Sequence, residues 1–254
     1  MLINAVSFQK VMQPVCRVAV LVAASIFSAP AAIAQTSAPL EQGGIYMGLS
    51  GGVVQPIGTT DIRGDVGSGT FVIPFTGSVE YRAGLSGRAA IGYEERIQTP
   101  DNVDDTDQVA PRYRAELEAL MLQARRTRSI QGLLAVEPDD SLKAQVIFAN
   151  GYLRLLGKNR TRLWVGAGLG NATVSLPDAR RIAPCACLAP AKGKGLAYQA
   201  KLALEIRLAP RLQFVIEAAL VSLPGLATAE GQRPNASYAK STFATADIGL
   251  RLSF

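Results

Sequence analysis

The sequence predicts an all-β protein that folds as an eight-stranded antiparallel transmembrane β-barrel. From Phe243 to the last residue, Phe254, apolar residues alternate with polar or small ones, which is the period of a strand with two different faces. Seven further segments alternate similarly, and each has roughly ten residues, the length that a tilted strand needs to cross a bilayer. Beyond residue 34 there is no run of about eighteen apolar residues that could form a membrane-spanning helix.

The eight predicted strands follow one another along the chain. They cover residues 45–54, 79–94, 112–125, 142–155, 162–174, 198–207, 212–220 and 243–254. The segment 198–207 alternates most clearly, with Tyr198, Leu202 and Ile206 on its apolar face. The segment 112–125 is rich in helix-forming residues, but the alternation of its first half and the period of its neighbours favour a strand.

Most connections between these strands alternate between long and short. Long connections are predicted at residues 55–75, 127–141, 175–195 and 222–240, and short turns at residues 157–159 and 209–211. The connection 97–111 is long and acidic where a short turn is expected. The alternatives are a ten-stranded barrel that uses residues 70–75 as an additional strand, or a different register around residues 70–111.

The first 34 residues have the order of a secretory signal peptide. Lys10 and Arg17 form a basic part, residues 18–27 form an apolar part, and Ala32 and Ala34 place small residues at the cleavage positions. The apolar run is too short for a membrane-spanning anchor. We therefore expect this segment to be removed after export.

The mature chain is expected to begin near Gln35, with a polar lead-in at residues 35–43 and a barrel domain at residues 44–254. Loss of the two basic residues of the signal peptide lowers the formal net charge from +6 to +4. Because this excess is small and dispersed along the chain, it does not indicate a nucleic-acid partner.

Several stretches resemble one family of membrane proteins. The ending ADIGLRLSF resembles the assembly signal of bacterial outer-membrane β-barrel proteins. The stretches RAELEALM, WVGAGLG and LAYQAKLALEIRLAPRLQF are similar, in order and spacing, to the eight-stranded family that includes opacity-type surface proteins and the membrane domain of outer membrane protein A. The resemblance covers residues 44–254.

This resemblance implies a location and partners. It implies a bacterial outer-membrane protein whose assembly signal, Phe254, is read by the barrel-assembly machinery. It also implies contact with outer-membrane lipid and lipopolysaccharide, and extracellular loops available to a host or surface ligand. The function expected on these grounds is that of an integral surface protein with an envelope-structural or adhesin-like role.

Charged residues recur on one face of the predicted strands. Unpaired charges at membrane depth are costly, so these residues should face the barrel interior and pair with one another. The predicted interior charges are Arg82, Arg88, Arg114, Glu116, Glu118, Lys143, Lys201, Glu205, Arg207, Glu217, Asp247 and Arg251, with Glu80 and Glu94 beside them. An eight-stranded barrel is just wide enough for side chains to fill it, so we expect a plug of ion pairs. A narrow small-solute porin is the alternative.

Enzymatic chemistry is not indicated. The chain contains no histidine, so a Ser-His-Asp hydrolase has no imidazole base. The aspartates of residues 101–107 do not have the spacing of a calcium loop, and an acidic turn is the better interpretation. We expect neither a cofactor nor a metal site.

Two groups of residues at the ends of the predicted strands are candidates for a role outside the barrel wall: a pair of cysteines and a cluster of arginines. Cys185 and Cys187 lie two residues apart in the connection 175–195, where they form either a small disulfide or two surface thiols. Arg125, Arg126 and Arg128 lie where a strand leaves the membrane. They are candidates for contact with lipopolysaccharide phosphates, because Arg pairs well with phosphate, or else form a solvated basic edge.

Overall fold

The computed structural model describes a β-barrel formed by the chain after residue 43. The described residues are 44–68, 71–95, 113–131, 134–136, 140–157, 160–177, 190–229 and 235–254. The predicted signal peptide and lead-in, the acidic connection 97–111 and the loop with Cys185 and Cys187 lie outside these residues. No helix in the described ranges is long and apolar enough to cross a membrane.

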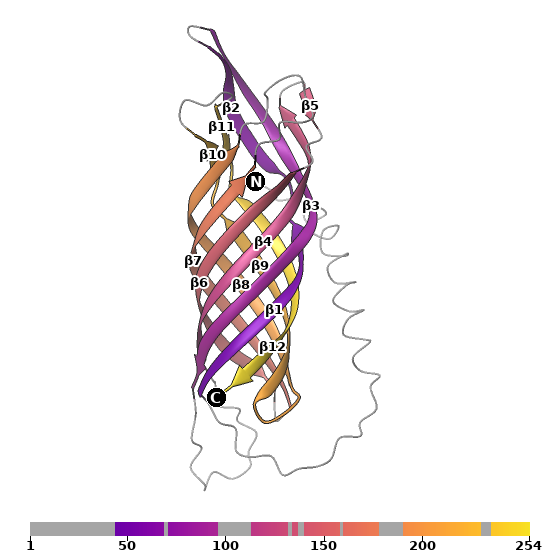
Figure 1. Cartoon of the computed structure of the whole chain (residues 1–254), viewed down its shortest axis with the longest axis vertical. Coiled ribbons are helices and arrows are strands. Elements are labelled where there is room, and N and C mark those ends of the chain that lie inside the picture. The colour runs from indigo at the N-terminus through magenta and orange to yellow at the C-terminus, as the bar shows by residue number, and fades with distance from the viewer. Residues whose placement is uncertain are drawn as a thin grey trace, which may run out of the picture. The chain divides into compact units, whose positions relative to one another are not determined.

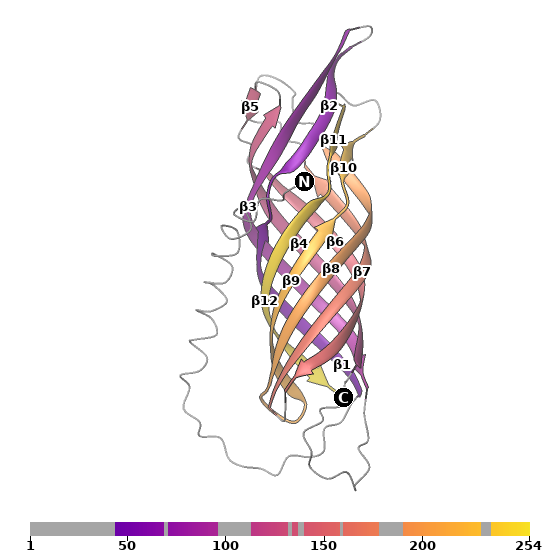
Figure 2. The ribbon, with the colours of Figure 1, turned by 180° about the vertical axis from the view of Figure 1, so that it is seen from behind.

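The regular structure of the described residues consists of β-strands. These are β1 Gly44–Pro56, β2 Thr60–Ser68, β3 Phe71–Glu94, β4 Tyr113–Gln131, β5 Leu134–Val136, β6 Asp140–Leu156, β7 Thr161–Leu176, β8 Ala191–Arg207, β9 Leu212–Leu223, β10 Leu226–Thr228, β11 Asn235–Tyr238 and β12 Ser241–Ser253. Eight of them form a closed antiparallel wall in the order β1-β3-β4-β6-β7-β8-β9-β12, which Figures 1 and 2 show from opposite sides. The predicted eight-stranded barrel is confirmed.

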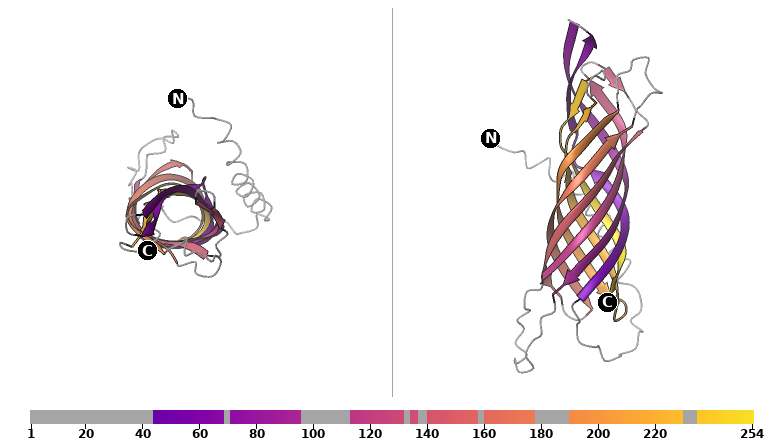
Figure 3. Two further views of the ribbon diagram at one scale, coloured as in Figure 1. Left: turned by 90° about the horizontal axis from the view of Figure 1, so that it is seen from above. Right: turned by 60° about the vertical axis from the view of Figure 1, so that its left-hand side comes forward.

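The last strand closes the wall against the first. β12 pairs with β1 from Phe243 opposite Pro56 to Ser253 opposite Tyr46. The backbone N–H of Phe254 then donates to the carbonyl of Ile45 at 2.9 Å. Seen along its axis in Figure 3, the wall forms a complete ring. Closure matters because an open edge would leave backbone donors and acceptors unpaired in hydrocarbon.

The upper end of the wall, where β2 and β3 project in Figure 1, continues beyond a line of breaks. β1 and β9 end at breaks at residues 57–59 and 224–225, after which the chain continues as β2 and β10, and a third break at residues 239–240 separates β11 from β12. Gly58 adopts the left-handed conformation, with a φ of 79°, at the first break. β2 pairs with β3 and β11, while β10 pairs with β11 and β8, so strand pairing carries on above the breaks.

The strands above the breaks, β2, β10, β11 and the beginning of β3, form the upper tier of the barrel. Two expectations about this part of the chain were wrong. Residues 55–75, predicted as a loop, mostly form the hairpin of β2 and the beginning of β3. The ten-stranded alternative is wrong, because residues 71–75 lengthen an existing wall strand and add no new one. Alternation could not reveal β2, since its sequence TDIRGDVGS has few apolar residues and is held by backbone pairing on both sides.

The outer face of the wall is a continuous apolar belt. Its large exposed residues include Ile45, Met47, Leu49, Val53, Leu85, Ile91, Leu117, Met121, Ile147, Leu153, Val165, Leu169, Leu196, Leu202, Leu220, Ile248, Leu250 and Leu252. Tyr93, Tyr113 and Phe254 are exposed at the lower end, where β3 and β12 end and β4 begins. An apolar band with aromatic residues at its edge is typical of a barrel that faces lipid.

A bulge in β3 reverses the predicted faces of its upper part. The register between β3 and β4 shifts between Arg82 and Leu85. Tyr81 is consequently buried inside the barrel and Arg82 is exposed outside it, the reverse of the expectation from simple alternation. Below the bulge the expected alternation holds, with Ser86 and Arg88 inside. One extra residue in a strand moves every following side chain to the other face.

Candidate functional site: the two-zone barrel interior

The interior of the barrel is divided along its axis into a charged lower zone and an apolar upper zone. Single strands contribute to both. On β4 the inward residues Arg114, Glu116 and Glu118 are followed by Leu120 and Leu122. The charged zone comprises the buried residues Arg88, Glu94, Arg114, Glu116, Glu118, Arg162, Lys201, Glu205, Glu217, Asp247 and Arg251. Five of these are basic and six acidic, so their charges nearly cancel.

Arg88 lies at the top of the charged zone and uses its whole guanidinium group. Its Nε donates to Asp247 Oδ2 at 3.0 Å, and its Nη1 donates to Glu118 Oε1 at 2.5 Å and to Gln199 Oε1 at 3.1 Å. Its Nη2 donates to the Thr245 hydroxyl at 2.8 Å. One arginine therefore ties together β3, β4, β8 and β12, four strands of the ring.

Glu116 is an acidic counterpart of Arg88, because several side chains donate hydrogen bonds to it. The hydroxyls of Tyr46 on β1 and Tyr152 on β6 each donate to it at 2.7 Å, from the two sides of β4. Asn150 Nδ2 donates to it at 3.1 Å, and Arg251 Nη2 donates at 3.5 Å. A buried carboxylate is stable only when its oxygens are satisfied in this way, so these donors compensate for its removal from water.

The lowest layer combines ion pairs with aromatic rings. Arg114 pairs with Glu205 at 2.6 Å and with Glu94 at 3.2 Å, while its guanidinium carbon lies 3.9 Å from the centroid of the Trp164 ring. The indole N–H of Trp164 donates to Glu205 Oε2 at 2.9 Å. Arg162 pairs with Glu94 at 3.2 Å. A guanidinium group between carboxylates and an aromatic face is favourably placed on both sides.

Three inward glycines of β7 make room for these side chains. Gly166, Gly168 and Gly170 lie opposite Tyr152, Asn150 and Phe148 of β6. A Cβ added to any of these glycines would collide with the side chain opposite it. The run WVGAGLG therefore lets the larger β6 side chains lie flat across the neighbouring strand.

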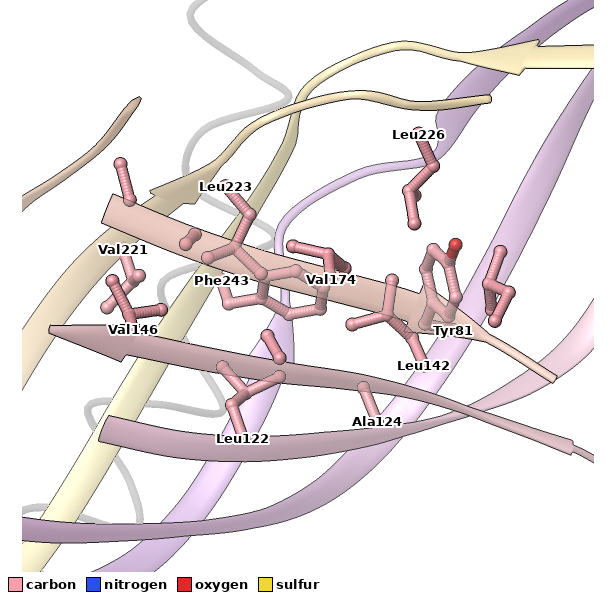
Figure 4. Packing of buried hydrophobic residues seen from close by; sticks show 14 of the residues in the cluster. Tyr81, Leu122, Ala124, Leu142, Val146, Val174, Val221, Leu223, Leu226 and Phe243 are labelled. Carbon is pink, nitrogen blue, oxygen red and sulfur yellow. The ribbon is translucent and has the colours of Figure 1, made fainter. Parts of the chain in front are cut away.

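The apolar zone fills the barrel above Phe148. Its residues pack against one another across the interior, as Figure 4 shows for Leu122, Val146 and Phe243. The zone comprises Val54, Ile62, Val79, Tyr81, Leu120, Leu122, Ala124, Leu142, Ala144, Val146, Phe148, Ala172, Val174, Leu176, Ala191, Ala197, Ala219, Val221, Leu223, Leu226, Ala236, Tyr238 and Phe243.

A small polar group closes the apolar zone from above. Arg126 is buried and forms an ion pair with Asp140 through two of its nitrogens. The Tyr238 hydroxyl lies against the same guanidinium group, and burial raises the pKa of this hydroxyl. Tyr238 is therefore a neutral partner for Arg126 at the upper end of the barrel.

A cavity of about 20 Å³ lies in the charged zone and is lined by residues including Ser50, Arg88, Glu118, Glu217 and Arg251. This is room for one or two water molecules. Across the described strands, no group of three or more Cys, Asp or Glu side chains is arranged to hold a metal ion.

The structure places nine of the twelve predicted interior charges inside the barrel. They are Arg88, Arg114, Glu116, Glu118, Lys201, Glu205, Glu217, Asp247 and Arg251. Arg82 is outside because of the β3 bulge, and Arg207 is only half-buried at the end of β8. Lys143 is exposed on the outer face, because at its height the inward residues of β6 are Leu142 and Ala144.

Other interior residues were not predicted. Arg162 lies two residues before Trp164 on the same inward face of β7, so alternation could have identified it. The pair Arg126–Asp140 could not be found in this way, since its two residues come from different strands and only the register brings them together.

The three candidate lipopolysaccharide arginines do not share a face. Arg125 and Arg128 are exposed on the outside, whereas Arg126 points into the barrel. Neighbouring residues of a strand point to opposite faces, so Arg125 and Arg126 cannot both reach the membrane surface.

The fold of this chain is similar to that of several solved outer-membrane proteins. No protein-family model matches the chain, and no curated protein matches it. Among solved structures, the outer membrane protein OprG from Pseudomonas aeruginosa matches with a TM-score of 0.52 and 14% identity, over 83% of this chain and 96% of OprG. Neisserial surface protein A matches with a TM-score of 0.44 and 10% identity, over 83% and 97% of the two chains. The outer membrane protease OmpT from Escherichia coli has a TM-score of 0.44 and 11% identity, over 87% and 99%.

These similarities concern the fold. The closed strand order, the apolar outer belt and the match to OprG agree with one another. The chain is an eight-stranded antiparallel β-barrel of the outer-membrane type.

Proposed function

We propose that this protein is a non-conducting, non-enzymatic barrel of the bacterial outer membrane that presents a rigid β-structure at the cell surface. Its lower end would face the periplasm, since β1 begins and β12 ends there, and its upper end would project outward. The role would be envelope-structural or adhesin-like, carried by the projecting tier rather than by the interior.

The filled interior is the observation that carries this proposal. The charged zone is cross-linked by ion pairs, with Arg88 alone bonded to four side chains, and the apolar zone is packed above it. A solute would have to break buried ion pairs in one zone and displace packed side chains in the other. Breaking a buried pair costs roughly 3–5 kcal/mol, which opposes spontaneous opening.

Conductance separates the surface role from the porin alternative. The refolded protein, inserted into planar bilayers, is expected to give no discrete conductance steps at neutral pH. A porin inserted in the same bilayers verifies that steps are detectable. Reproducible steps from this protein would establish a pore and overturn the non-conducting proposal.

The projecting hairpin of β2 and β3 is the best candidate for surface contacts. Near its tip Val72 and Ile73 are both about half exposed, at 49% and 48%. Above the barrel these residues face water instead of lipid, where exposed apolar side chains commonly mark contact sites. Pro74 follows them and limits uncontrolled edge pairing, because proline offers no backbone donor.

Adhesion of whole cells to a surface tests whether the hairpin makes the proposed surface contacts. Cells that display a Val72→Ser/Ile73→Ser variant should adhere several-fold less to a hydrophobic or epithelial surface than cells that display the parent. A Thr76→Ser variant changes an exposed residue of the same hairpin without removing apolar surface, and it should adhere normally. Equal adhesion of all three, at equal surface levels, would remove the hairpin from the proposed role.

The proposal that the protein is not an enzyme rests on its chemistry. Without histidine, no interior carboxylate can work with an imidazole, and the buried acids are held in ion pairs. OmpT shows that a related fold can belong to a protease. Peptide and phospholipid substrates incubated with the refolded barrel should remain intact, and turnover abolished by a single substitution would contradict this expectation.

A further inference from the structure

The end of the projecting hairpin is a two-stranded ribbon. β3 pairs with β4 only from Gly77 downward, so residues 71–76 of β3 pair with β2 alone. On its other side, β2 is covered by β11 only as far as Asp65. We call residues 66–68 of β2 and 71–75 of β3 the ribbon tip, which projects beyond the rest of the described barrel in Figure 1.

Both faces of the ribbon tip present an apolar side chain to water. Val72 and Ile73 are neighbours on β3, so their side chains point to opposite faces of the strand. They are nevertheless almost equally exposed, at 49% and 48%. Their register partners are Gly67 and Val66, which lie beyond the end of β11, so the described strands cover neither face.

The ribbon tip is also free of charge. From residue 66 to residue 79 the sequence contains no Asp, Glu, Lys or Arg. The nearest charged residues on β2 are Arg63 and Asp65, which lie opposite Thr76 and Pro74, below the level of Val72. Moving the ribbon tip from water into apolar surroundings therefore does not require the removal of an ionised side chain from water.

Pro74 disfavours the addition of a further strand to β3. The carbonyl of Asp61 accepts from the N–H of Ala239, so Asp61 directs its backbone groups away from β3. Its register partner Ser78 therefore directs its own backbone groups away from β2, and by alternation Pro74 does the same. Because proline has no N–H, another strand could not form a complete ladder along this edge.

A lipid bilayer fits these properties better than a groove in a protein. A groove encloses one face of a strand and leaves the other in water, whereas a bilayer surrounds both faces. The unpaired backbone groups at the ribbon edges oppose deep insertion into hydrocarbon. They are tolerated in the hydrated interfacial region, where apolar side chains enter to a depth of about 5–10 Å.

The bilayer in question is not the one that holds the barrel. Leu85, which is 70% exposed, lies at the upper limit of the apolar belt on β3. Ile73 is twelve residues further along β3, which corresponds to about 40 Å of extended strand. With a strand tilt of about 40°, the ribbon tip lies roughly 30 Å above the belt. It can therefore reach only a membrane that faces the cell.

We infer that the ribbon tip inserts both faces into the interfacial region of a phospholipid bilayer apposed to the cell surface. This inference rests on the proposed surface role of the hairpin and names its partner. Val72 and Ile73 enter the boundary between head groups and acyl chains, while Arg63 and Asp65 remain in water. Many barrels in one membrane act together, because each ribbon tip buries only a small apolar area.

Capture of vesicles tests the inference. Dense proteoliposomes that contain the refolded barrel are mixed with labelled, protein-free phosphatidylcholine vesicles, and the label that sediments with them is measured. Val72→Ser/Ile73→Ser should lower capture at least about tenfold, because it removes most of the apolar area available for burial. The control Thr76→Ser should change capture less than about twofold. Capture should be equal at low and high salt, since no charge is involved. Heat-modifiable gel mobility verifies that each variant is folded.

Tryptophan probes test the two-sided insertion independently of the serine variant. Val72→Trp and Ile73→Trp should each show a blue-shifted emission with the vesicles and be quenched when the protein-free vesicles carry brominated acyl chains. Ala239→Trp is the control, because Ala239 is hydrogen bonded to Asp61 and lies about 16 Å below Ile73 along the hairpin. Its emission should not change, and the buried Trp164 of the parent barrel provides the baseline.

The outcomes distinguish this inference from the proposed function. If neither probe is quenched while Val72→Ser/Ile73→Ser still lowers adhesion of whole cells, the hairpin contacts a protein, and the inference is overturned while the surface role stands. Quenching of only one probe shows a one-sided contact and also overturns it, as does capture that is lost at high salt. If adhesion of cells and capture of vesicles are both unaffected by the serine variant, the proposed role of the hairpin fails as well.

Discussion

The charged and apolar zones of the barrel interior are formed by the same strands but obey opposite rules. Where the outer face presents Leu117 and Ala119 to lipid, the interior holds Glu116 and Glu118. Higher on β4, Leu122 lies inside while Gln123 and Arg125 are exposed outside. The lower part of the barrel thus has a polar interior and an apolar outer face. The upper part has an apolar interior and a polar outer face, as a water-soluble β-barrel has.

This contrast concerns how each zone is stabilised. The apolar zone gains by burial, and its contacts are non-directional. In the charged zone burial is a cost, which only complete pairing offsets. The two zones should therefore respond differently to substitution, the charged zone through groups left unpaired and the apolar zone through lost packing.

The largest expected effect comes from Glu118→Leu. Glu118 accepts from Arg88 and Lys201, both at 2.5 Å, so its loss leaves two buried cations without their shortest partner. We expect a destabilisation of about 3–5 kcal/mol, or failure to assemble. Urea unfolding of the barrel in lipid vesicles measures it, with Lys143→Gln on the outer face as control. A change below about 1 kcal/mol would contradict the pairing account.

A smaller effect is expected from Leu122→Ala in the apolar zone. Leu122 is 3% exposed, and its truncation leaves a cavity without an unpaired charge, so we expect about 2–3 kcal/mol. The adjacent Met121 is 64% exposed to lipid and provides the matched control, since Met121→Ala should cost well under half as much. Equal losses at the two positions would show that the upper interior is not packed as described.

Tyr152→Phe should have a modest effect. It removes one of the donors to Glu116 while leaving the other hydroxyl, from Tyr46, in place. A hydrogen bond to a charged group contributes about 1.5–3 kcal/mol, and we expect the lower end of that range. Tyr198→Phe, at an exposed tyrosine of β8, should be neutral in the same unfolding measurement. If Tyr198→Phe lowers the free energy of unfolding more than Tyr152→Phe does, the hydrogen bond from Tyr152 to Glu116 does not stabilise the barrel as described.

The smallest effect is expected from Arg82→Gln. Its side chain is outside, so the change should alter stability by less than about 0.5 kcal/mol. The inward Arg88→Gln, only six positions along β3, should by contrast cost several kcal/mol. Comparable losses for the two arginines would mean that Arg82 faces the interior and that the β3 bulge is absent.

Strand period predicted the lower part of this molecule well. Residues of β8 and β9 such as Lys201, Glu205 and Glu217 alternate with apolar neighbours over several positions, and the structure buries all three. The same reasoning misplaced Lys143, because it assumed that apolar residues face outward along the whole strand. Alternation shows that a strand has two faces, but not which face is the inner one.

The upper tier was the least predictable region. β2 has few apolar residues, and its place follows from pairing with β3 and with β11, which is distant from it in the sequence. The β3 bulge likewise has no clear sequence signal and is defined by register against β4. Both features decide which side chains meet, and both depend on contacts between strands.

The sequence by itself determined the class of fold, the number of wall strands and the fact that charges must be paired inside, because alternation and the cost of unpaired charge in lipid are local properties of each strand. Only the tertiary structure decided the two-zone interior, the burial of Arg126 and the outward position of Arg82. These depend on register, and a shift of one residue exchanges the two faces of a strand.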